Sequence, residues 1–166
     1  MKIAIVSDTH GCWQSVRQAL EAEDGVDYLF FLGDMVADGQ KLAQVLGMPA
    51  YIVRGNCDGL AQEPAELTVN IGGVNFLLCH GDRYQVKNTL TPLCLRGQEL
   101  GADIICFGHT HQPMYEEEAV ILINPGSASR PRLLDEWPSW GLLELTDNPA
   151  SGKKVKKYMK KGLPKL

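Results

Sequence analysis

The feature that most constrains the fold of this chain is a series of short apolar runs, each of which ends in a loop of glycine and polar residues. All four histidines, His10, His80, His109 and His111, lie in such loops. Strand ends in α/β architectures converge on a common crevice, so the pattern predicts that these imidazoles share one site. Imidazole, carboxylate and amide groups suit divalent ions of borderline hardness. A hydrolase with two metal ions is therefore the first hypothesis.

The apolar runs have the length and the alternation of β-strands. We expect strands at residues 3–6, 28–32, 51–53, 67–71, 74–79, 103–107, 114–117, 120–123, 140–146 and 155–159. The pair Gly72-Gly73 between two of these runs is a good signal for a β-hairpin. Helical spacing of apolar residues predicts helices around residues 13–20 and 42–46.

A third helix is expected at Thr91-Pro92, which resembles an N-cap followed by proline at the first helical position. It would end near Leu100, with Gly101 after the cap. Helices dominate early in the chain and hairpins dominate late, whereas a single doubly wound sheet would alternate throughout. The mixture predicts two packed mixed sheets with helices outside, a four-layer α/β/β/α sandwich. The length predicts one domain over residues 1–166.

The composition is that of an ordinary globular protein, with 45% hydrophobic and 22% charged residues. No apolar run approaches the length that crosses a bilayer, and Met1–Val6 is too short for a signal peptide, so no membrane partner is expected. The five cysteines include no C-x-x-C pair, and Cys79 and Cys106 are expected to be buried thiols. A reducing, cytoplasmic location fits this pattern best.

The net charge of −4 is unevenly distributed. Residues 153–165 hold seven lysines and no acid, while the rest of the chain has nine basic and 20 acidic residues, a net charge of −11. One interpretation of the lysines is a solvated edge strand or chain end. The other is attraction of a phosphorylated substrate or nucleic acid. Seven like charges on a short segment support nucleic-acid binding only weakly, so nucleic acid is not the expected partner.

Taken one at a time, the polar motifs carry little information. In Asp8-x-His10 the two side chains point to one side of an extended segment and could meet one ion, but such a triplet is more often an ordinary loop. The pair His109-x-His111 is more informative, because Gly108 lets the chain turn sharply at the end of a strand. A metal role and an ordinary role are equally compatible with that pair alone.

Taken together, the five loops provide enough ligands for two ions that share a bridging carboxylate. The seven ligand-type residues are Asp8, His10, Asp34, Asn56, His80, His109 and His111. The alternative, in which each residue serves only its own loop, requires five independent coincidences.

These residues make the sequence similar to the calcineurin-type metallophosphoesterases. The motifs D-x-H at 8–10, G-D at 33–34, G-N-x-D at 55–58, H-G at 80–81 and G-H-x-H at 108–111 occur in that family's order. The sequence N-P-G-S at 124–127 resembles a loop of the family's small, single-domain phosphodiesterase branch. The resemblance covers most of the chain, and the full ordered set is specific where a single motif is not.

The resemblance implies a ligand assignment with Asp34 as the bridge. One ion would take Asp8, His10, Asp34 and His111, and the other would take Asp34, Asn56, His80 and His109. Manganese is the family-like choice, and zinc, iron, nickel and cobalt also suit these ligands. The implied activity is hydrolysis of a small-molecule phosphodiester by a hydroxide that bridges the two ions. Asn56 would also donate an amide hydrogen bond to a phosphate oxygen.

The chain departs from the family pattern at Cys57, where many relatives carry a histidine that assists the leaving group, and Asp58 would then lose its usual partner. A thiol is a poorer proton donor, so Cys57 is expected to narrow the activity to phosphodiesters with good leaving groups. The alternative is that Cys57 only fills space. Arg130 and Arg132 either contact a substrate phosphate or are solvated in a surface loop.

Other functions stay open at this point. A non-catalytic metal-binding scaffold of the same fold, of the retromer-subunit type, tends to have altered ligands, whereas all seven are present here. Nucleases of the superfamily usually bring extra DNA-binding segments, for which this chain has no room. A phosphomonoesterase would be expected to keep the missing histidine. Homo-oligomerisation is also left open.

Overall fold

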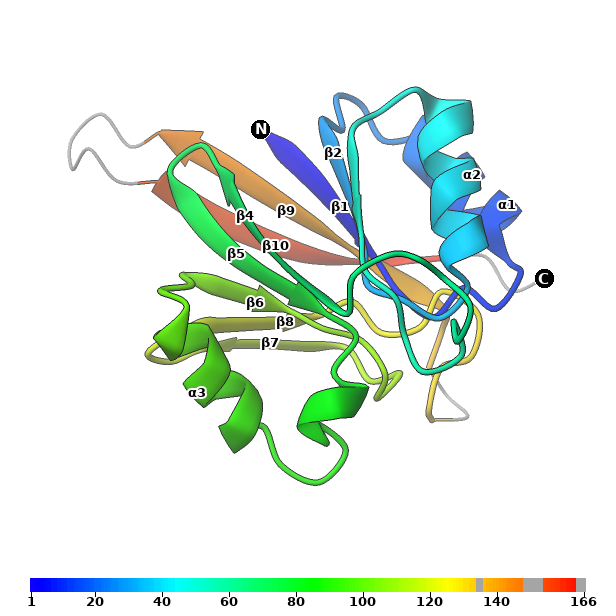
Figure 1. Ribbon diagram of the computed structural model, residues 1–166. Helices are drawn as coiled ribbons and strands as arrows, with labels where there is room; N and C mark the ends of the chain where they lie inside the picture. Colours follow the sequence, from blue (N-terminus) through cyan, green and yellow to red (C-terminus); the bar gives the residue numbers. More distant parts are fainter. Residues whose placement is uncertain (134–135, 148–153, 164–166) are drawn as a thin grey trace.

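Two five-stranded mixed sheets pack face to face in the computed structural model, which describes residues 1–133, 136–147 and 154–163 (Figure 1). The first sheet has the order β10-β9-β1-β2-β3, with the bounds Lys154–Gly162, Ser139–Asp147, Lys2–Val6, Tyr28–Phe31 and Ala50–Ile52. The second has the order β4-β5-β6-β8-β7, with the bounds Glu66–Ile71, Val74–Cys79, Ile104–Cys106, Ile121–Asn124 and Met114–Glu117. Helices α1 (Trp13–Glu21) and α2 (Val36–Leu46) cover the first sheet, and α3 (Thr91–Glu99) covers the second. The expected four-layer sandwich is confirmed.

Alternation along a strand divides its side chains between two interfaces. In β1, Ile3 and Ile5 face the second sheet, while Ala4 and Val6 face α1 and α2. All four are fully buried because both faces of the strand are covered. A third apolar cluster lies under α3, where Leu93 packs against side chains of β5 and β6. The sandwich therefore provides a rigid frame whose loops carry the polar residues.

Parallel pairing directs those loops to one end of the sandwich. In the first sheet β1 pairs in parallel with β2, and β2 with β3. In the second sheet β5, β6 and β8 are parallel. The loops after β1, β2, β3, β5 and β6 leave their strands at the carboxyl ends, and Figure 1 shows these loops meeting at one end of the two sheets.

Two local predictions can be compared with the structure. The β4–β5 hairpin through Gly72 and Gly73 is confirmed, and so is the end of α3, where Gly101 has a φ of 65°. The expectation that Thr91 is the N-cap of α3 is wrong by one residue. The helix begins at Thr91 and Leu90 occupies the cap position, because the backbone of Thr91 is already helical.

The lysine-rich segment forms β10, the outer strand of the first sheet. Lys157 and Lys160 are exposed, and Lys161 forms an ion pair of 3.0 Å with Glu23, just after α1. The edge-strand interpretation is confirmed for the part of the segment that is described. Attraction of an anionic partner stays a prediction, as does the extent of a single domain over residues 1–166.

The cysteines have the states that the sequence predicts. Cys79 and Cys106 are buried, and all five cysteines are free. Within the described ranges, no helix has both the length and the apolar character that spanning a bilayer requires.

The inter-sheet core includes Phe30 of β2 and Phe76 of β5, whose rings meet edge to face with centroids 5.1 Å apart. We expect Phe76→Ala to lower the free energy of unfolding by about 3–5 kcal/mol, because truncation removes buried contacts and leaves a cavity. Urea denaturation followed by circular dichroism measures the change. The control is Leu60→Ala, at a residue that is 96% exposed, with an effect below about 0.5 kcal/mol. Equal effects of the two substitutions would contradict this account of the core.

Candidate metal centre

Backbone hydrogen bonds join loops that follow different strands. The N–H of Asp8, after β1, donates to the carbonyl of Gly33, after β2 (3.1 Å). The N–H of Gly108, after β6, donates to the carbonyl of His80, after β5 (2.9 Å). These bonds fix the separation of loop tips that carry the candidate ligands.

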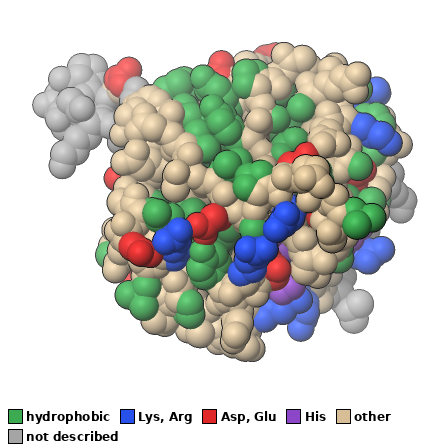
Figure 2. Space-filling view, in the orientation of Figure 1, with side chains coloured by type: hydrophobic (Ala, Val, Ile, Leu, Met, Phe, Trp, Pro, Cys, Tyr) green, Lys and Arg blue, Asp and Glu red, His purple; other side chains and the backbone are tan. Residues whose placement is uncertain are grey.

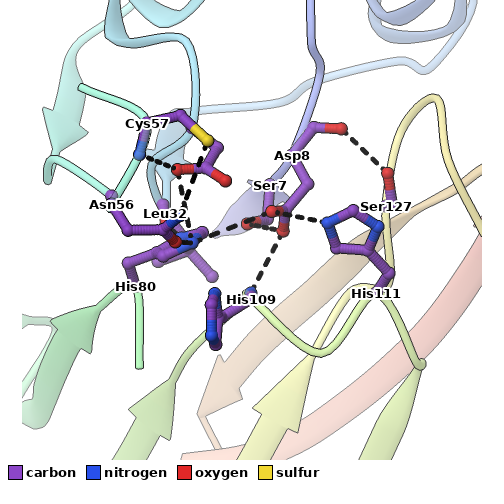
Figure 3. Close-up of polar contacts among 12 residues, drawn as sticks. Ser7, Asp8, Leu32, Asn56, Cys57, His80, His109, His111 and Ser127 are labelled. Atoms are coloured by element: carbon purple, nitrogen blue, oxygen red, sulfur yellow. Dashed lines mark hydrogen bonds and ion pairs between the residues drawn. The ribbon is translucent and has the colours of Figure 1, made fainter. Parts of the chain in front are cut away.

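The buried carboxylate of Asp8 turns one oxygen towards the middle of the loop cluster (Figure 3). Its Oδ2 accepts hydrogen bonds from the Ser7 hydroxyl (2.5 Å) and from the N–H of His109 (3.2 Å). Its Oδ1 is buried and accepts no hydrogen bond of regular geometry from the described residues, although His111 Nε2 lies 3.1 Å and His80 Nε2 3.8 Å away. Burial of a carboxylate oxygen without a donor is costly, and a cation at this point would remove the cost.

His80 presents its Nε2 atom to the same place. Its Nδ1–H donates to the carbonyl of Leu32 (2.7 Å), which leaves the lone pair on Nε2. This nitrogen nevertheless faces acceptors, with Asn56 Oδ1 at 3.1 Å and Asp34 Oδ1 at 3.4 Å. Lone pairs that face one another at such distances repel unless a proton or a metal ion lies between them. The arrangement therefore fits a cation held by these three side chains.

His111 is oriented in the same way from the opposite side. Its Nδ1–H donates to the carbonyl of Arg130 (2.7 Å), so its Nε2 points at Asp8. The Nε2 atom of His10 is buried without a hydrogen-bond partner in the described part of the chain and lies 3.9 Å from Asp34 Oδ2. The ring centroids of His10 and His111 are 5.6 Å apart. A second set of ligand atoms thus converges beside the first.

Two groups of ligand atoms result, and the atoms of each lie within 4.8 Å of one another. One group consists of Asp8, His10 and His111, and the other of Asp8, Asp34 and His80. Asp8 belongs to both. Asp34 directs Oδ1 towards His80 and Oδ2 towards His10, so its two oxygens face imidazoles of both groups. Donors of this kind fit a divalent ion in each group.

His109 lies next to the second group, with its ring centroid 5.1 Å from that of His80. Burial lowers the pKa of His109, and the nearby charges of His80 and Lys87 lower it further, so the ring is neutral and can act as a ligand. The structure therefore brings all seven candidate ligands to one end of the sandwich. Their assignment to individual ions stays a prediction.

The electrostatics of the site favour a bound positive charge. Burial alone would raise the pKa of Asp34, but the hydrogen bond and charge of His80, together with the N–H of Cys57, hold that pKa well below its ordinary value. Burial would lower the pKa of His80, yet the carboxylates of Asp34 and Asp8 raise it above its ordinary value. A divalent ion would supply the charge that a proton otherwise supplies.

Five of the seven candidate ligands have left-handed backbone conformations. Their φ angles are 55° for Asp8, 42° for His10, 57° for Asp34, 65° for His109 and 59° for His111. A non-glycine residue in this region costs of order 1–3 kcal/mol and persists only where the surroundings impose it. The concentration of such residues at one place is itself an indication of a functional site.

Two glycines are required because the loops approach each other closely. A β-carbon at Gly33 would lie 2.6 Å from the backbone nitrogen of Gly55 and 2.9 Å from His80 Nδ1. A β-carbon at Gly55 would collide with Asp34 Oδ1. The glycines of the G-D and G-N-x-D motifs thus allow the two loops to reach the same ligand cluster.

Comparison with known proteins identifies the family. The family model described as the calcineurin-like phosphoesterase superfamily domain matches residues 1–148. The chain belongs to this superfamily. It is 35% identical over 155 residues to the probable metallophosphoesterase YsnB of Bacillus subtilis, covering 91% of this chain and 88% of the relative. It is 31% identical over 157 residues to the phosphodiesterase YfcE of Escherichia coli K12, covering 80% and 82%.

Solved structures have the same fold. A conserved protein of Streptococcus pneumoniae, described as a predicted phosphoesterase, superposes with a TM-score of 0.77 at 24% identity over 96% of this chain and 97% of the other. Vps29 of Entamoeba histolytica, complexed with zinc, superposes with a TM-score of 0.73 at 20% identity over 96% and 99%. At these identities the likeness shows the fold alone. Together with the family match, it confirms the resemblance that the motifs indicated.

Asp58 holds the loops of the candidate metal centre in position. Its Oδ1 accepts the N–H groups of Met35 and Val36, both at 2.9 Å, and its Oδ2 accepts those of Asp34 (2.8 Å) and Gly55 (2.9 Å). One carboxylate thus holds the loops after β2 and β3 against the start of α2, where the helix dipole also favours a negative charge. These partners do not depend on which side chain stands at position 57.

Asp38, in the first turn of α2, was not singled out from the sequence. Its buried carboxylate accepts the hydroxyl of Thr9 (2.7 Å) and the N–H of Gly11 (2.8 Å). It therefore fixes the loop that carries Asp8 and His10. An acid in the first turn of a helix is common, and the sequence contains no local signal that it binds a loop 27 residues earlier.

The N-P-G-S segment connects loops from the two sheets. The buried amide of Asn124 donates to the carbonyl of Gly108 (2.9 Å), and the hydroxyl of Ser127 donates to the carbonyl of Asp8 (2.8 Å). The segment thus positions the D-x-H loop and the G-H-x-H loop relative to each other. This explains in physical terms why the segment accompanies the ligand motifs.

Cys57 is exposed, so its side chain does not fill space in the core. Burial of the sulfur and the nearby Asp34 raise the pKa of the thiol, which is therefore protonated at neutral pH. Its N–H donates to Asp34 Oδ1 (2.9 Å). The backbone of Cys57 thus supports the candidate bridge, and its Sγ atom accepts a hydrogen bond from the side-chain amide of Asn56 (3.5 Å).

Basic side chains lie near the ligand cluster. Arg130 and Arg132 are exposed. Burial lowers the pKa of His10, and the positive charge of Arg130 lowers it further. Lys87, which the sequence interpretation missed, lines a cleft of about 170 Å³ together with Arg132. An isolated lysine in a loop carries no motif, so only the fold could reveal its position.

We expect Asp58→Asn to weaken manganese binding by about 10- to 100-fold, because an amide accepts with one oxygen and turns its NH2 group against two of the four N–H groups. Isothermal titration calorimetry measures the dissociation constant. Glu99→Gln, at an exposed acid on α3, is the matched control and should bind like the wild type. Unchanged binding in Asp58→Asn would show that the loops hold their positions without this carboxylate.

Proposed function

We propose that this chain is a metal-dependent phosphodiesterase that works with two divalent ions, most simply manganese. The observation that carries the proposal is that two ligand groups share buried Asp8, whose Oδ1 atom has no hydrogen-bond partner among the described residues. The family match supports phosphoester chemistry, and the likeness to the phosphodiesterase YfcE supports a diester. The proposed substrate is a small phosphodiester.

The proposed ligands are those that the sequence predicts. One ion would be held by Asp8, His10, Asp34 and His111, and the other by Asp34, Asn56, His80 and His109. Asp34 is the proposed bridge, which the division of its two oxygens between His10 and His80 supports. When bound, the two ions would lower the pKa of water and neutralise charge on the phosphoryl oxygens.

The side chains around the ions perform the remaining tasks. The amide group of Asn56 has Oδ1 turned towards His80, and Nδ2 donates one hydrogen bond to Cys57 Sγ (3.5 Å). The second N–H of Nδ2 is the proposed donor to a phosphate oxygen. Lys87 and Arg130 place positive charge beside the imidazoles, which attracts an anionic ester. No side-chain nucleophile is needed, because the proposed attacking group is water. The thiol of Cys57 is protonated, so it is not a competing nucleophile.

The preference for diesters rests on Cys57. A neutral thiol at this position provides neither the charge nor the acidity of an imidazolium, so a departing alkoxide receives little help. Phosphodiesters with good leaving groups need that help least. The proposal includes a cytoplasmic location, which the five free cysteines support.

We expect EDTA to abolish turnover of bis(p-nitrophenyl) phosphate and manganese to restore it better than zinc, nickel or cobalt. Asp8→Asn should lower kcat/KM by at least about 100-fold, because it removes the charge that both ligand groups share. The matched control is Asp24→Asn at an exposed acid. Specific metal uptake without turnover of any diester or monoester would favour the scaffold function, which the Vps29-like fold also permits.

We expect Cys57→His to raise the rate on diesters with poor leaving groups by about 10- to 100-fold, because an imidazolium can protonate the departing oxygen. The measurement is the dependence of kcat on leaving-group pKa across a series of aryl and alkyl esters. Cys57→Ser, which restores no proton donor of suitable acidity, is the control. An unchanged leaving-group dependence in Cys57→His would refute the role given to position 57.

A further inference from the structure

A second cleft, of about 400 Å³, adjoins the metal centre. Its walls come from the start of the loop that leads to Asn56, from the segment after His80 and from α3. Three arginines line it, Arg54, Arg83 and Arg96, and we call it the arginine cleft. None of the proposed ligands lines this cleft, so the metal-dependent chemistry leaves its purpose unexplained.

One of the three arginines is paired with two carboxylates. Arg96 binds Glu66 at 2.6 Å and Glu99 at 2.8 Å. Glu66, which also lines the cleft, accepts a second hydrogen bond from the hydroxyl of Tyr84. The principal acid of the cleft wall is thus neutralised by its own neighbours.

The other two arginines lack such partners. Within the described ranges, no carboxylate lies within 4.0 Å of the guanidinium of Arg54 or Arg83. Arg54 has five N–H donors, and one of them donates a long hydrogen bond of 3.5 Å to the carbonyl of Ala61. Asp82, the remaining acid in the wall, is close enough to the metal centre for its charge to oppose part of the lowering of the pKa of His109. Two half-buried or exposed guanidinium groups therefore face the cleft with unused donors.

The position of these arginines is set by the ligand loops. Arg54 stands two residues before Asn56, and Arg83 lies in the short 3-10 helix η1 (Asp82–Tyr84), three residues after His80. Figure 2 shows Lys and Arg side chains gathered beside a histidine on this face of the molecule. The arginine cleft and the metal centre are therefore built partly from the same loops, those after β3 and β5.

We propose that the arginine cleft binds a second phosphate group on the same substrate molecule whose phosphodiester lies at the metal centre. Guanidinium forks recognise phosphate oxygens bidentately, and two unpaired forks in one cleft suit a doubly charged phosphate better than a carboxylate. The inference deepens the proposed function, on which it rests, by naming the substrate class. The preferred substrates are phosphodiesters that carry a separate phosphate monoester.

The test compares two chromogenic diesters that differ only in that group. The first is the p-nitrophenyl ester of thymidine 5′-phosphate with a free 3′-hydroxyl, and the second carries a 3′-phosphate. The wild-type protein with manganese should show a kcat/KM about tenfold higher for the second, through a lower KM. Added NaCl should reduce this ratio.

Substitution of the arginines provides the second arm. In Arg54→Gln/Arg83→Gln the ratio should fall towards one, whereas Arg54→Lys/Arg83→Lys should retain part of it. The matched control, Lys157→Gln/Lys160→Gln on β10, removes the same charge from exposed positions and should keep the full ratio. Circular dichroism establishes that each variant is folded.

A binding measurement separates this inference from the proposed function. Pyrophosphate should bind the metal-free protein in EDTA. The double substitution Arg54→Gln/Arg83→Gln should raise the dissociation constant at least about tenfold. Arginine-dependent binding of pyrophosphate without turnover of either diester would support a phosphate site in the arginine cleft and contradict the proposed phosphodiesterase activity. Turnover of both diesters with equal kcat/KM, and a pyrophosphate affinity that is insensitive to the arginines, would overturn the inference and leave the phosphodiesterase intact.

Discussion

The candidate metal centre depends on the way in which Asp8 is held. Its N–H is bonded to the loop after β2, its carbonyl accepts the hydroxyls of Ser127 and Ser129, and its Oδ2 accepts two further donors. Every polar group of the residue except Oδ1 is therefore used by the protein. Because the partners come from both sheets, the geometry of this oxygen is fixed by the whole sandwich rather than by its own loop.

The fold stabilises a ligand cluster that is unfavourable by itself. Left-handed backbones at five candidate ligands and a carboxylate oxygen without a donor are local costs. The inter-sheet core, with the buried contact between Phe30 and Phe76, supplies the stability that offsets them. Asp58 and Asp38 hold the loops in position by accepting charge-assisted hydrogen bonds from backbone N–H groups and, at Asp38, from the hydroxyl of Thr9. A protein arranged in this way gives up some stability to keep its ligands in place.

The sequence was sufficient for the strands, the two sheets and the gathering of the candidate ligands at one end of them. Period-two apolar runs identify strands, and polar residues at their carboxyl ends converge in any parallel pairing. The sequence was insufficient wherever a side chain acts on a distant loop, as Asp38 does on Gly11 and Asn124 on Gly108. Such bonds leave no periodic signal. The start of α2 is an example. The N–H groups of Met35 and Val36 donate to Asp58, which lies over 20 residues further along the chain.

The position of β10 has a consequence for behaviour in concentrated solution. An outer strand presents unpaired backbone groups on which another chain could add a strand. Here that border is lined with lysines such as Lys157 and Lys160, so two approaching copies meet as like charges. Mutual repulsion of these borders protects against fibrous assembly, and neutralising the lysines by acetylation would remove the protection.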